Sequence, residues 1–174
     1  GHAHLDLAWL WPIRESKRKA KRTFANAVDL MKRYPQYHFV VPQPQQLAWM
    51  KELDPKLYEE IKQLVKEGRM EPVGGGWVEN DTNLPNEESL VRQELYGQKF
   101  WKEEFGNYVK LRWLPDTFGY SAAIPQIMQG CGVKYFYTTK MDWGDLNKFP
   151  VHTFRWRGLD GSEVISHLNR IHFI

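Results

Sequence analysis

Short apolar runs alternate with amphipathic helical patterns along this chain, and that alternation restricts the fold more than any other feature. The apolar runs predict strands at 38–41, 70–73, 109–114 and 133–138. The helical patterns predict helices at 14–33, 45–53, 55–68, 87–105 and 122–130. Several of the strands lack polar alternation, as expected where helices cover both faces of a parallel sheet. The sequence therefore predicts an α/β fold built from β/α units.

Turn and capping residues add detail to this outline. Asn83 or Asn86 could cap the fourth helix, because an asparagine side chain accepts a hydrogen bond from the first helical turn. An Asp-Gly pair at 160–161 predicts a hairpin turn between two later strands, at 153–157 and 163–168. This hairpin would add an antiparallel pair to the sheet.

Composition bounds the class of protein. The 174 residues are enough for one domain with a sizeable core, and 42% hydrophobic and 26% charged residues are globular values. The net charge of +3 includes a basic run at 14–22 that fits a solvated helix face, and no nucleic-acid-binding motif accompanies it. No apolar run is long enough to span a bilayer, and a single cysteine, Cys131, favours a reducing compartment. We therefore expect a cytoplasmic protein without nucleic-acid or membrane partners.

The first six residues carry two candidate metal ligands. His4 and Asp6 are separated by one residue, so on an extended chain both side chains point to the same face. A buried histidine pair, His2 and His4, could instead be satisfied by backbone carbonyl groups. Asp6 favours metal binding, because an unpaired carboxylate in an apolar setting would be costly. His2 would then support the site rather than form it.

Asp116 is a third candidate ligand. It lies in the segment Trp-Leu-Pro-Asp-Thr-Phe-Gly-Tyr-Ser at 113–121, directly after an apolar strand. The ordinary alternative is that Asp116 caps the helix that follows. A cap does not require the flanking aromatic residues, so we favour a functional role. One imidazole nitrogen and two carboxylates suit Zn²⁺ or a similar ion with an open coordination position, which indicates a metal-dependent hydrolase.

The segment at 74–81, Gly-Gly-Gly-Trp-Val-Glu-Asn-Asp, lacks the pattern of a phosphate-binding loop. Its glycines would let the backbone approach a ligand or a neighbouring strand closely. Glu79 and Asp81 would share one face and could bind sugar hydroxyl groups, although a solvated acidic loop is an equal alternative. The eight tryptophans include candidates for stacking on sugar rings, while most of them should simply fill the core.

With these segments in view, the chain resembles the α-mannosidases of glycoside hydrolase family 38. The run His-Leu-Asp-Leu-Ala-Trp at 4–9 is similar to the metal motif of that family, and 114–121 to its nucleophile motif. Residues 77–81 and 149–162 are similar to its cytosolic and bacterial branch. The resemblance covers essentially the whole chain, with the motifs in the right order.

The resemblance implies a retaining glycosidase on a seven-stranded parallel β/α catalytic domain. It implies that His4, Asp6 and Asp116 hold a divalent metal, normally Zn²⁺ with Co²⁺ also suitable, and that Asp116 is the nucleophile. The metal would bind the vicinal 2- and 3-hydroxyls of a terminal mannose in an oligosaccharide. The side chains expected around the sugar are Trp9 beneath the ring, Phe118 in the pocket wall, Lys140 near the nucleophile and, from the acidic segment, Asp81.

The resemblance also implies that further catalytic groups follow residue 174. In the family a histidine serves as fourth ligand and an aspartate as general acid, and neither His167 nor His172 matches those places. We therefore expect 1–174 to be the N-terminal portion of the catalytic domain, truncated at both ends and inactive alone. Whether the full-length parent is a homo-oligomer stays open.

Two other classes of function compete with this one. A metal-dependent amidohydrolase or deacetylase would use His2 and His4 together as metal ligands. A non-catalytic carbohydrate-binding module would use the tryptophan-rich surface and bind sugar in the presence of a chelator. The segment around Asp116 weighs against both.

Overall fold

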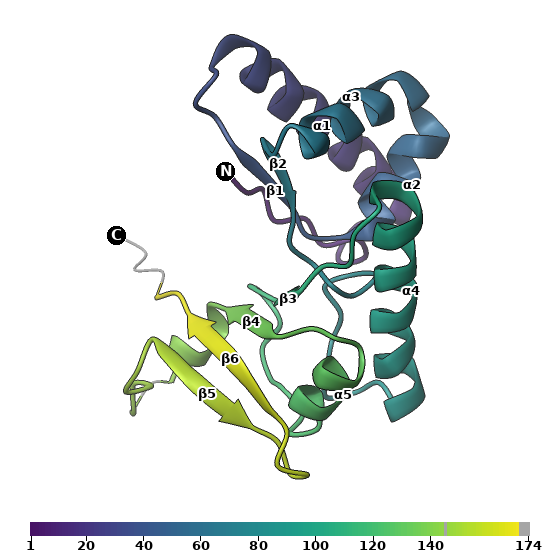
Figure 1. Cartoon of the computed structure of the whole chain (residues 1–174). Coiled ribbons are helices and arrows are strands. Elements are labelled where there is room, and N and C mark those ends of the chain that lie inside the picture. The colour runs from purple at the N-terminus through teal and green to yellow at the C-terminus, as the bar shows by residue number, and fades with distance from the viewer. Residues whose placement is uncertain (145, 171–174) are drawn as a thin grey trace.

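The computed structural model describes residues 1–144 and 146–170 (Figure 1). The helices are α1 (Ile13–Arg33), α2 (Pro44–Leu53), α3 (Pro55–Lys66), α4 (Glu87–Phe105), α5 (Ile124–Gly130) and the short 3-10 turn η1 (Lys140–Asp142). The strands are β1 (Phe39–Val41), β2 (Met70–Pro72), β3 (Leu111–Trp113), β4 (Tyr135–Thr138), β5 (Thr153–Arg157) and β6 (Glu163–Leu168). The predicted elements are confirmed, with ends that shift by at most two residues. Within the described ranges, no helix has both the length and the apolar character needed to cross a bilayer.

The strands of the described residues form two sheets, one of two strands and one of four. β1 and β2 pair in parallel, and the second sheet has the order β3-β4-β6-β5. In that sheet β5 alone runs antiparallel, as the predicted hairpin requires. The backbone N–H of Gly75 donates to Leu111 O at 2.9 Å, and that of Val40 donates to Gly1 O at 2.9 Å. These bonds place the N-terminal segment beside β1, and the chain after β2 beside β3.

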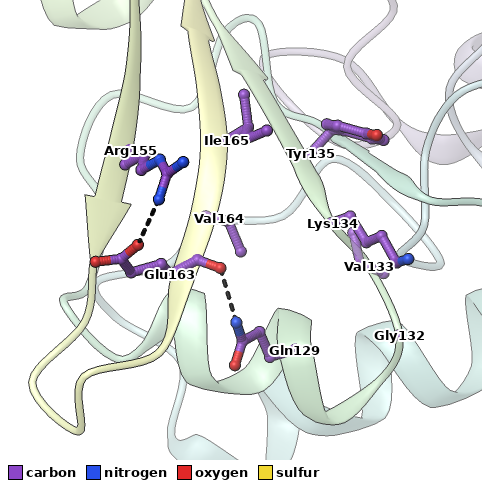
Figure 2. A pocket seen from close by; sticks show the side chains of 9 residues that line it. All are labelled: Gln129, Gly132, Val133, Lys134, Tyr135, Arg155, Glu163, Val164 and Ile165. Atoms are coloured by element: carbon purple, nitrogen blue, oxygen red, sulfur yellow. Dashed lines mark hydrogen bonds and ion pairs between the residues drawn. The ribbon is translucent and has the colours of Figure 1, made fainter.

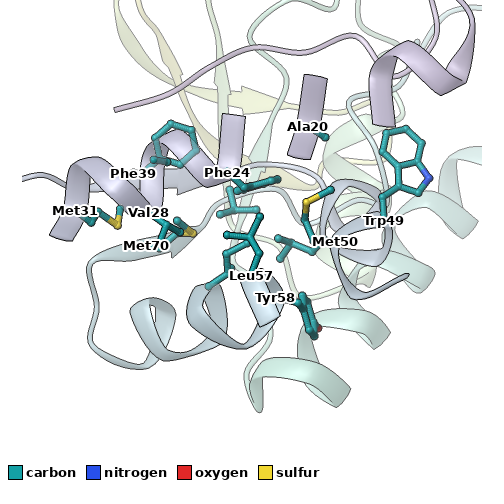
Figure 3. Packing of buried hydrophobic residues seen from close by; sticks show 14 of the residues in the cluster. Ala20, Phe24, Val28, Met31, Phe39, Trp49, Met50, Leu57, Tyr58 and Met70 are labelled. Atoms are coloured by element: carbon teal, nitrogen blue, oxygen red, sulfur yellow. The ribbon is translucent and has the colours of Figure 1, made fainter. Parts of the chain in front are cut away.

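The described residues thus form an α/β fold with a mixed sheet, and the α/β class is confirmed. The seven-stranded parallel β/α domain stays a prediction. Two hydrophobic clusters support the strands. The first lies between α1, α2, α3 and the β1-β2 pair (Figure 3). The second lies beneath α5 and includes side chains from β4 and β6.

The face of α1 that was expected to be apolar is buried in the first cluster, with Phe24, Ala27, Val28 and Met31 all nearly inaccessible. The ring of Phe24 meets that of Phe39 from β1 edge to face, with centroids 6.4 Å apart. Burying such side chains contributes roughly 1.5–3 kcal/mol each. The helical period of the sequence therefore determines which face of α1 packs on the sheet.

Helix α4 connects the two clusters. Near its start it contributes Leu90 to the second cluster, and near its end it contributes Trp101 to the first. The side chain of Asn86 accepts a bond from Ser89 N at 2.9 Å, so Asn86 rather than Asn83 is the N-cap. The indole of Trp101 donates to Gly74 O at 2.6 Å. The helix thereby holds residues 74–76, the glycine segment, which connects β2 with the chain beside β3.

The glycine segment needs its small residues because other backbone lies against it. A Cβ built at Gly74 would overlap the carbonyl oxygen of Pro42. A Cβ built at Gly97, on the facing side of α4, would overlap the carbonyl oxygen of Gly75. The expectation of close backbone approach is confirmed, with a neighbouring strand and a helix as the partners.

We predict that Gly97→Ala lowers the free energy of unfolding by about 1–3 kcal/mol, because α4 must move away from the glycine segment. Gly130→Ala is the matched control, since Gly130 is also helical and its Cβ would enter open space. That control should be neutral or stabilising by up to about 1 kcal/mol. Urea denaturation of both variants measures the difference. Equal stability of the two variants would contradict the packing described here.

Candidate active site

Loops that follow parallel strands meet at one edge of the fold, the position where α/β sheets place their ligands. The N-terminal segment beside β1 supplies His4 and Asp6, and the chain after β2 supplies Glu79. Asp116 follows β3, and Lys140 follows β4. A pocket of about 310 Å³ opens there. Its walls are formed by His4, Asp6, Ala8, Trp9, Glu79, Asp81, Asp116, Thr117 and Phe118.

The three predicted metal ligands lie together. One potential ligand atom from each of His4, Asp6 and Asp116 lies within 4.8 Å of the other two. His4 Nε2 is 3.2 Å from Asp6 Oδ1 and 3.5 Å from Asp116 Oδ2. Two ligands bound to Zn²⁺ at about 2.0–2.1 Å in tetrahedral geometry are separated by roughly 3.4 Å. The spacing and the donor types therefore fit such an ion.

The imidazole of His4 is surrounded by carboxylates. Its Nδ1 lies 2.9 Å from Glu79 Oε2, on the side away from Asp6 and Asp116. Burial alone would lower the pKa of His4, but the bond to Glu79 and the three negative charges together raise it to about 9. The protonated ring offsets part of the negative charge of the pocket. A metal ion that used Nε2 would have to displace this proton.

Glu79 belongs to the pocket wall, but its carboxylate is largely covered. Its side chain is only 5% exposed, and both carboxylate oxygens are buried. Burial raises the pKa of this carboxyl group, against the opposing influence of His4 and Arg112. The alternative of a solvated acidic loop is wrong for Glu79. Its neighbour Asp81 does reach the pocket, and its Oδ1 accepts bonds from the backbone N–H groups of Asn83 (2.6 Å) and Leu84 (2.9 Å).

Neither His2 nor His167 belongs to the cluster of candidate ligands in the described part of the chain. His2 packs edge-on against Trp113, with centroids 5.2 Å apart, and burial and the charge of His4 lower its pKa to about 4. The amidohydrolase hypothesis requires His2 and His4 to bind metal together, but His2 is not part of the cluster that contains His4. His167 Nδ1 lies 2.8 Å from the hydroxyl of Thr153 in the hairpin. His172 lies outside the described residues.

Asp116 is held in a turn, with a basic partner. Lys140 Nζ lies 2.6 Å from Asp116 Oδ1, and the same ammonium group lies 3.1 Å from the ring centroid of Trp143. The turn is fixed to the end of β4, because the backbone N–H and the hydroxyl of Thr139 both donate to Pro115 O, at 3.3 and 2.7 Å. The capping alternative for Asp116 is wrong, since α5 has Ala123 as its N-cap.

Two exposed aromatic side chains line the pocket. Trp9 is 64% exposed and Phe118 is 77% exposed, although both rings are large and apolar. Trp9 makes an edge-on contact with Trp11, at 5.5 Å between centroids. Exposed rings beside carboxylates are a common arrangement in sites that bind partly apolar, hydroxyl-rich ligands. Their roles in sugar binding stay predictions.

Arg112 supports the site, and the sequence analysis did not identify it. This strand residue is 3% exposed, and its Nε lies 2.8 Å from Glu94 Oε1 of α4. The guanidinium also donates to Val78 O at 3.2 Å and contacts the side chain of Asn80. A charged residue inside an apolar strand pattern was the available signal, because such a residue must find a buried partner.

A second hollow, of about 470 Å³, lies at the opposite ends of β4 and β6 (Figure 2). Figure 2 shows the amide of Gln129 donating to Glu163 O, and the carboxylate of Glu163 turned toward Arg155, 3.7 Å away. None of the predicted catalytic or metal-binding side chains lines it. The candidate active site is therefore the pocket around His4.

The fold is of the α/β type, and the pocket brings together one imidazole, several carboxylates and two exposed aromatic rings. Residues 1–173 match the sequence model of the glycosyl hydrolases family 38 N-terminal domain. The chain belongs to this family, as the motifs at 4–9 and 114–121 indicated.

Individual relatives agree with this assignment. The chain is 52% identical over 167 residues to alpha-mannosidase 2C1 from Homo sapiens, and 44% identical over 169 residues to alpha-mannosidase from Saccharomyces cerevisiae. These alignments cover 96% and 97% of the chain but 16% of each relative. The fold is similar to the crystal structure of an alpha-mannosidase from Enterococcus faecalis V583, with a TM-score of 0.79 at 24% identity. That match covers 96% of this chain and 19% of the bacterial one.

We predict that Arg112→Ala destabilises the fold by about 3–5 kcal/mol, because it leaves the buried carboxylate of Glu94 without its partner. Arg92→Ala is the control, since Arg92 forms an exposed pair with Glu88 on the same helix as Glu94. An exposed helical pair of this kind contributes about 0.3–0.5 kcal/mol. Chemical denaturation of the two variants compares these losses. If Arg112→Ala lowered the free energy of unfolding by less than about 1 kcal/mol, the buried pair of Arg112 and Glu94 would not have the structural role described here.

Proposed function

We propose that this chain is the N-terminal part of the catalytic domain of an α-mannosidase that removes terminal α-mannosyl residues from oligosaccharides. Membership of family 38 and the α-mannosidase names of the relatives support the substrate class. The observation that carries the proposal is the placement of Asp116 between His4 and Lys140 in a pocket with exposed aromatic rings. The complete catalytic domain would have the seven-stranded β/α architecture of the family, of which these residues form a part.

His4, Asp6 and Asp116 would hold a divalent cation, because their donor types and spacing suit Zn²⁺ and also Co²⁺. When bound, the ion would supply Lewis-acid binding of the vicinal 2- and 3-hydroxyl groups of mannose. The carboxylates of Asp6 and Asp116 would keep the charge of the site close to balanced. The imidazole of His4 would bind through Nε2, the nitrogen that faces both carboxylates.

Asp116 would act as the nucleophile of a retaining mechanism. In such a mechanism an ionised carboxylate attacks the anomeric carbon, and a second carboxyl group protonates the leaving oxygen. The ammonium group of Lys140, 2.6 Å from Asp116 Oδ1, stabilises the negative charge that the attack requires. The second oxygen, Oδ2, lies on the side of His4. Within the described residues we assign no general acid.

The exposed rings and Asp81 would bind the sugar. The apolar faces of Trp9 and Phe118 are available for contact with the ring carbons, as their exposure shows. Asp81 uses Oδ1 in the turn that it caps, which leaves Oδ2 for a sugar hydroxyl group. A cytoplasmic location is proposed on the single Cys131, a half-buried free thiol, since a reducing compartment leaves such a group unoxidised.

We predict that a full-length enzyme carrying this chain hydrolyses p-nitrophenyl α-mannoside and loses this activity on chelation. Added Zn²⁺ or Co²⁺ should restore the rate, because both ions suit one imidazole and carboxylate oxygens. The measurement is release of p-nitrophenol before chelation, after it and after addition of metal. Sugar binding without turnover, unaffected by chelator, would indicate a binding module instead.

We predict that Asp116→Asn lowers kcat by more than about 10³-fold, because the amide is a poor nucleophile and a weaker ligand. His4→Ala should act mainly through metal loss, so a high concentration of Zn²⁺ should recover part of its activity. Asp160→Asn is the control, since Asp160 lies in the hairpin turn and bonds to Ser162. Near-normal turnover by Asp116→Asn would rule out its role as nucleophile.

A further inference from the structure

Glu79 differs from the other carboxylates of the pocket in its exposure. The side chain of Glu79 is 5% exposed, whereas those of Asp6 and Asp116 are 35% and 42% exposed. Both of its carboxylate oxygens are buried, although the residue belongs to the pocket wall. A buried carboxylate is costly unless a partner compensates it. The contact that Glu79 makes in the site is with His4.

The two ring nitrogens of His4 face different partners. Nδ1 lies 2.9 Å from Glu79 Oε2, and Nε2 faces Asp6 and Asp116. A neutral imidazole carries one N–H donor and one acceptor nitrogen. If Nδ1–H donates to Glu79, the lone pair of Nε2 points to the two carboxylates. A carboxylate that accepts this bond also makes the ring a stronger electron donor.

A buried amide fixes the backbone on both sides of this contact. Gln43 Oε1 accepts a bond from Glu79 N at 3.1 Å, and Gln43 Nε2 donates to Leu5 O at 3.0 Å. The side chain is buried, with Gln43 only 1% exposed. One residue thereby holds the segment after β2 and the segment of His4 at a fixed separation. The preceding residue is held as well, since Val78 N donates to Gln93 Oε1 at 3.1 Å.

We propose that Glu79 is a positioning residue of the metal site: it binds His4 Nδ1, fixes the ring and its tautomer, and so presents Nε2 as the ligand. The inference rests on the metal role of His4 in the proposed function. Glu79 itself touches neither sugar nor metal. Its contribution is to metal affinity and ligand geometry rather than to substrate contact.

Two substitutions separate this role from a merely structural one. Glu79→Leu removes the acceptor and replaces the buried carboxylate with an apolar side chain of similar size, while His4 keeps its exposed side toward the pocket. Glu79→Gln keeps the shape and one acceptor oxygen but removes the charge. Glu71→Leu is the control, because it removes a carboxylate from an exposed position on the neighbouring β2.

The test uses the full-length enzyme and measures Zn²⁺ affinity by competition with a chromophoric chelator. We expect Glu79→Leu to bind Zn²⁺ about 10–100-fold more weakly, since loss of a partner of a metal-bound histidine has this effect. Glu79→Gln should lose roughly 3–10-fold, because a neutral acceptor forms a weaker bond than a charged one. Glu71→Leu should bind as the unaltered enzyme does. The absorption spectrum of the Co²⁺-loaded enzyme should change for both substitutions at Glu79.

The melting temperature of each metal-free variant provides the second readout. A merely structural Glu79 would lower this temperature and leave the Zn²⁺ affinity of the folded fraction and the Co²⁺ spectrum unchanged, which would overturn the inference. If Glu79→Leu does not fold, unchanged affinity in Glu79→Gln overturns it equally. If the unaltered enzyme hydrolyses the mannoside but binds no Zn²⁺ or Co²⁺, the metal role of His4 fails, and the inference fails with it.

Discussion

The guanidinium group of Arg112 is the buried charge on which the arrangement of the site depends. It leaves water when β3 packs against α4, and the carboxylate of Glu94 compensates it there. Its remaining hydrogens bond Val78 O and contact Asn80, so the same group holds the loop that carries Glu79. A helix, a strand and a loop are thus joined by one planar group with several donors. A lysine has a single donor centre and could not bond all three partners in the same geometry.

Local sequence was sufficient to predict the helices and strands and to single out the three candidate ligands that cluster in the structure. Helical and strand periods are properties of neighbouring residues, and the one-residue spacing of His4 and Asp6 fixes their common face. Asp116 could be found because it ends a strand, and parallel strands end at one edge. The burial of the Glu79 side chain was not predicted, since the loop that carries it is held by Gln43 and Arg112, which are distant in sequence. Such contacts leave only a weak signal: a polar residue in an apolar run.

Each carboxylate around His4 has a basic group close to it. His4 lies among Asp6, Glu79 and Asp116, and Lys140 lies on the far oxygen of Asp116. At neutral pH the raised pKa of His4 keeps its ring protonated in the absence of metal. Together with Lys140, the protonated ring offsets part of the negative charge of the carboxylates in the pocket. A divalent cation could take over that function from the proton of His4, which explains how one set of residues forms a stable pocket and still fits a metal ion.

The side chains that hold the loops of the pocket together are buried, and the side chains proposed to bind the sugar are exposed. Gln43 and Arg112 are buried polar residues whose bonds run between segments of the chain, and the covered carboxylate of Glu79 contacts His4 of another segment. Such groups have no free surface for a ligand, and their cost of burial is recovered only while every segment stays in place. Trp9 and Phe118 are exposed apolar groups, which a folded chain would otherwise tend to bury. The buried bonds beneath the pocket would therefore keep it shaped before a ligand arrives, and the uncovered rings around it would supply the surface that the proposed sugar covers.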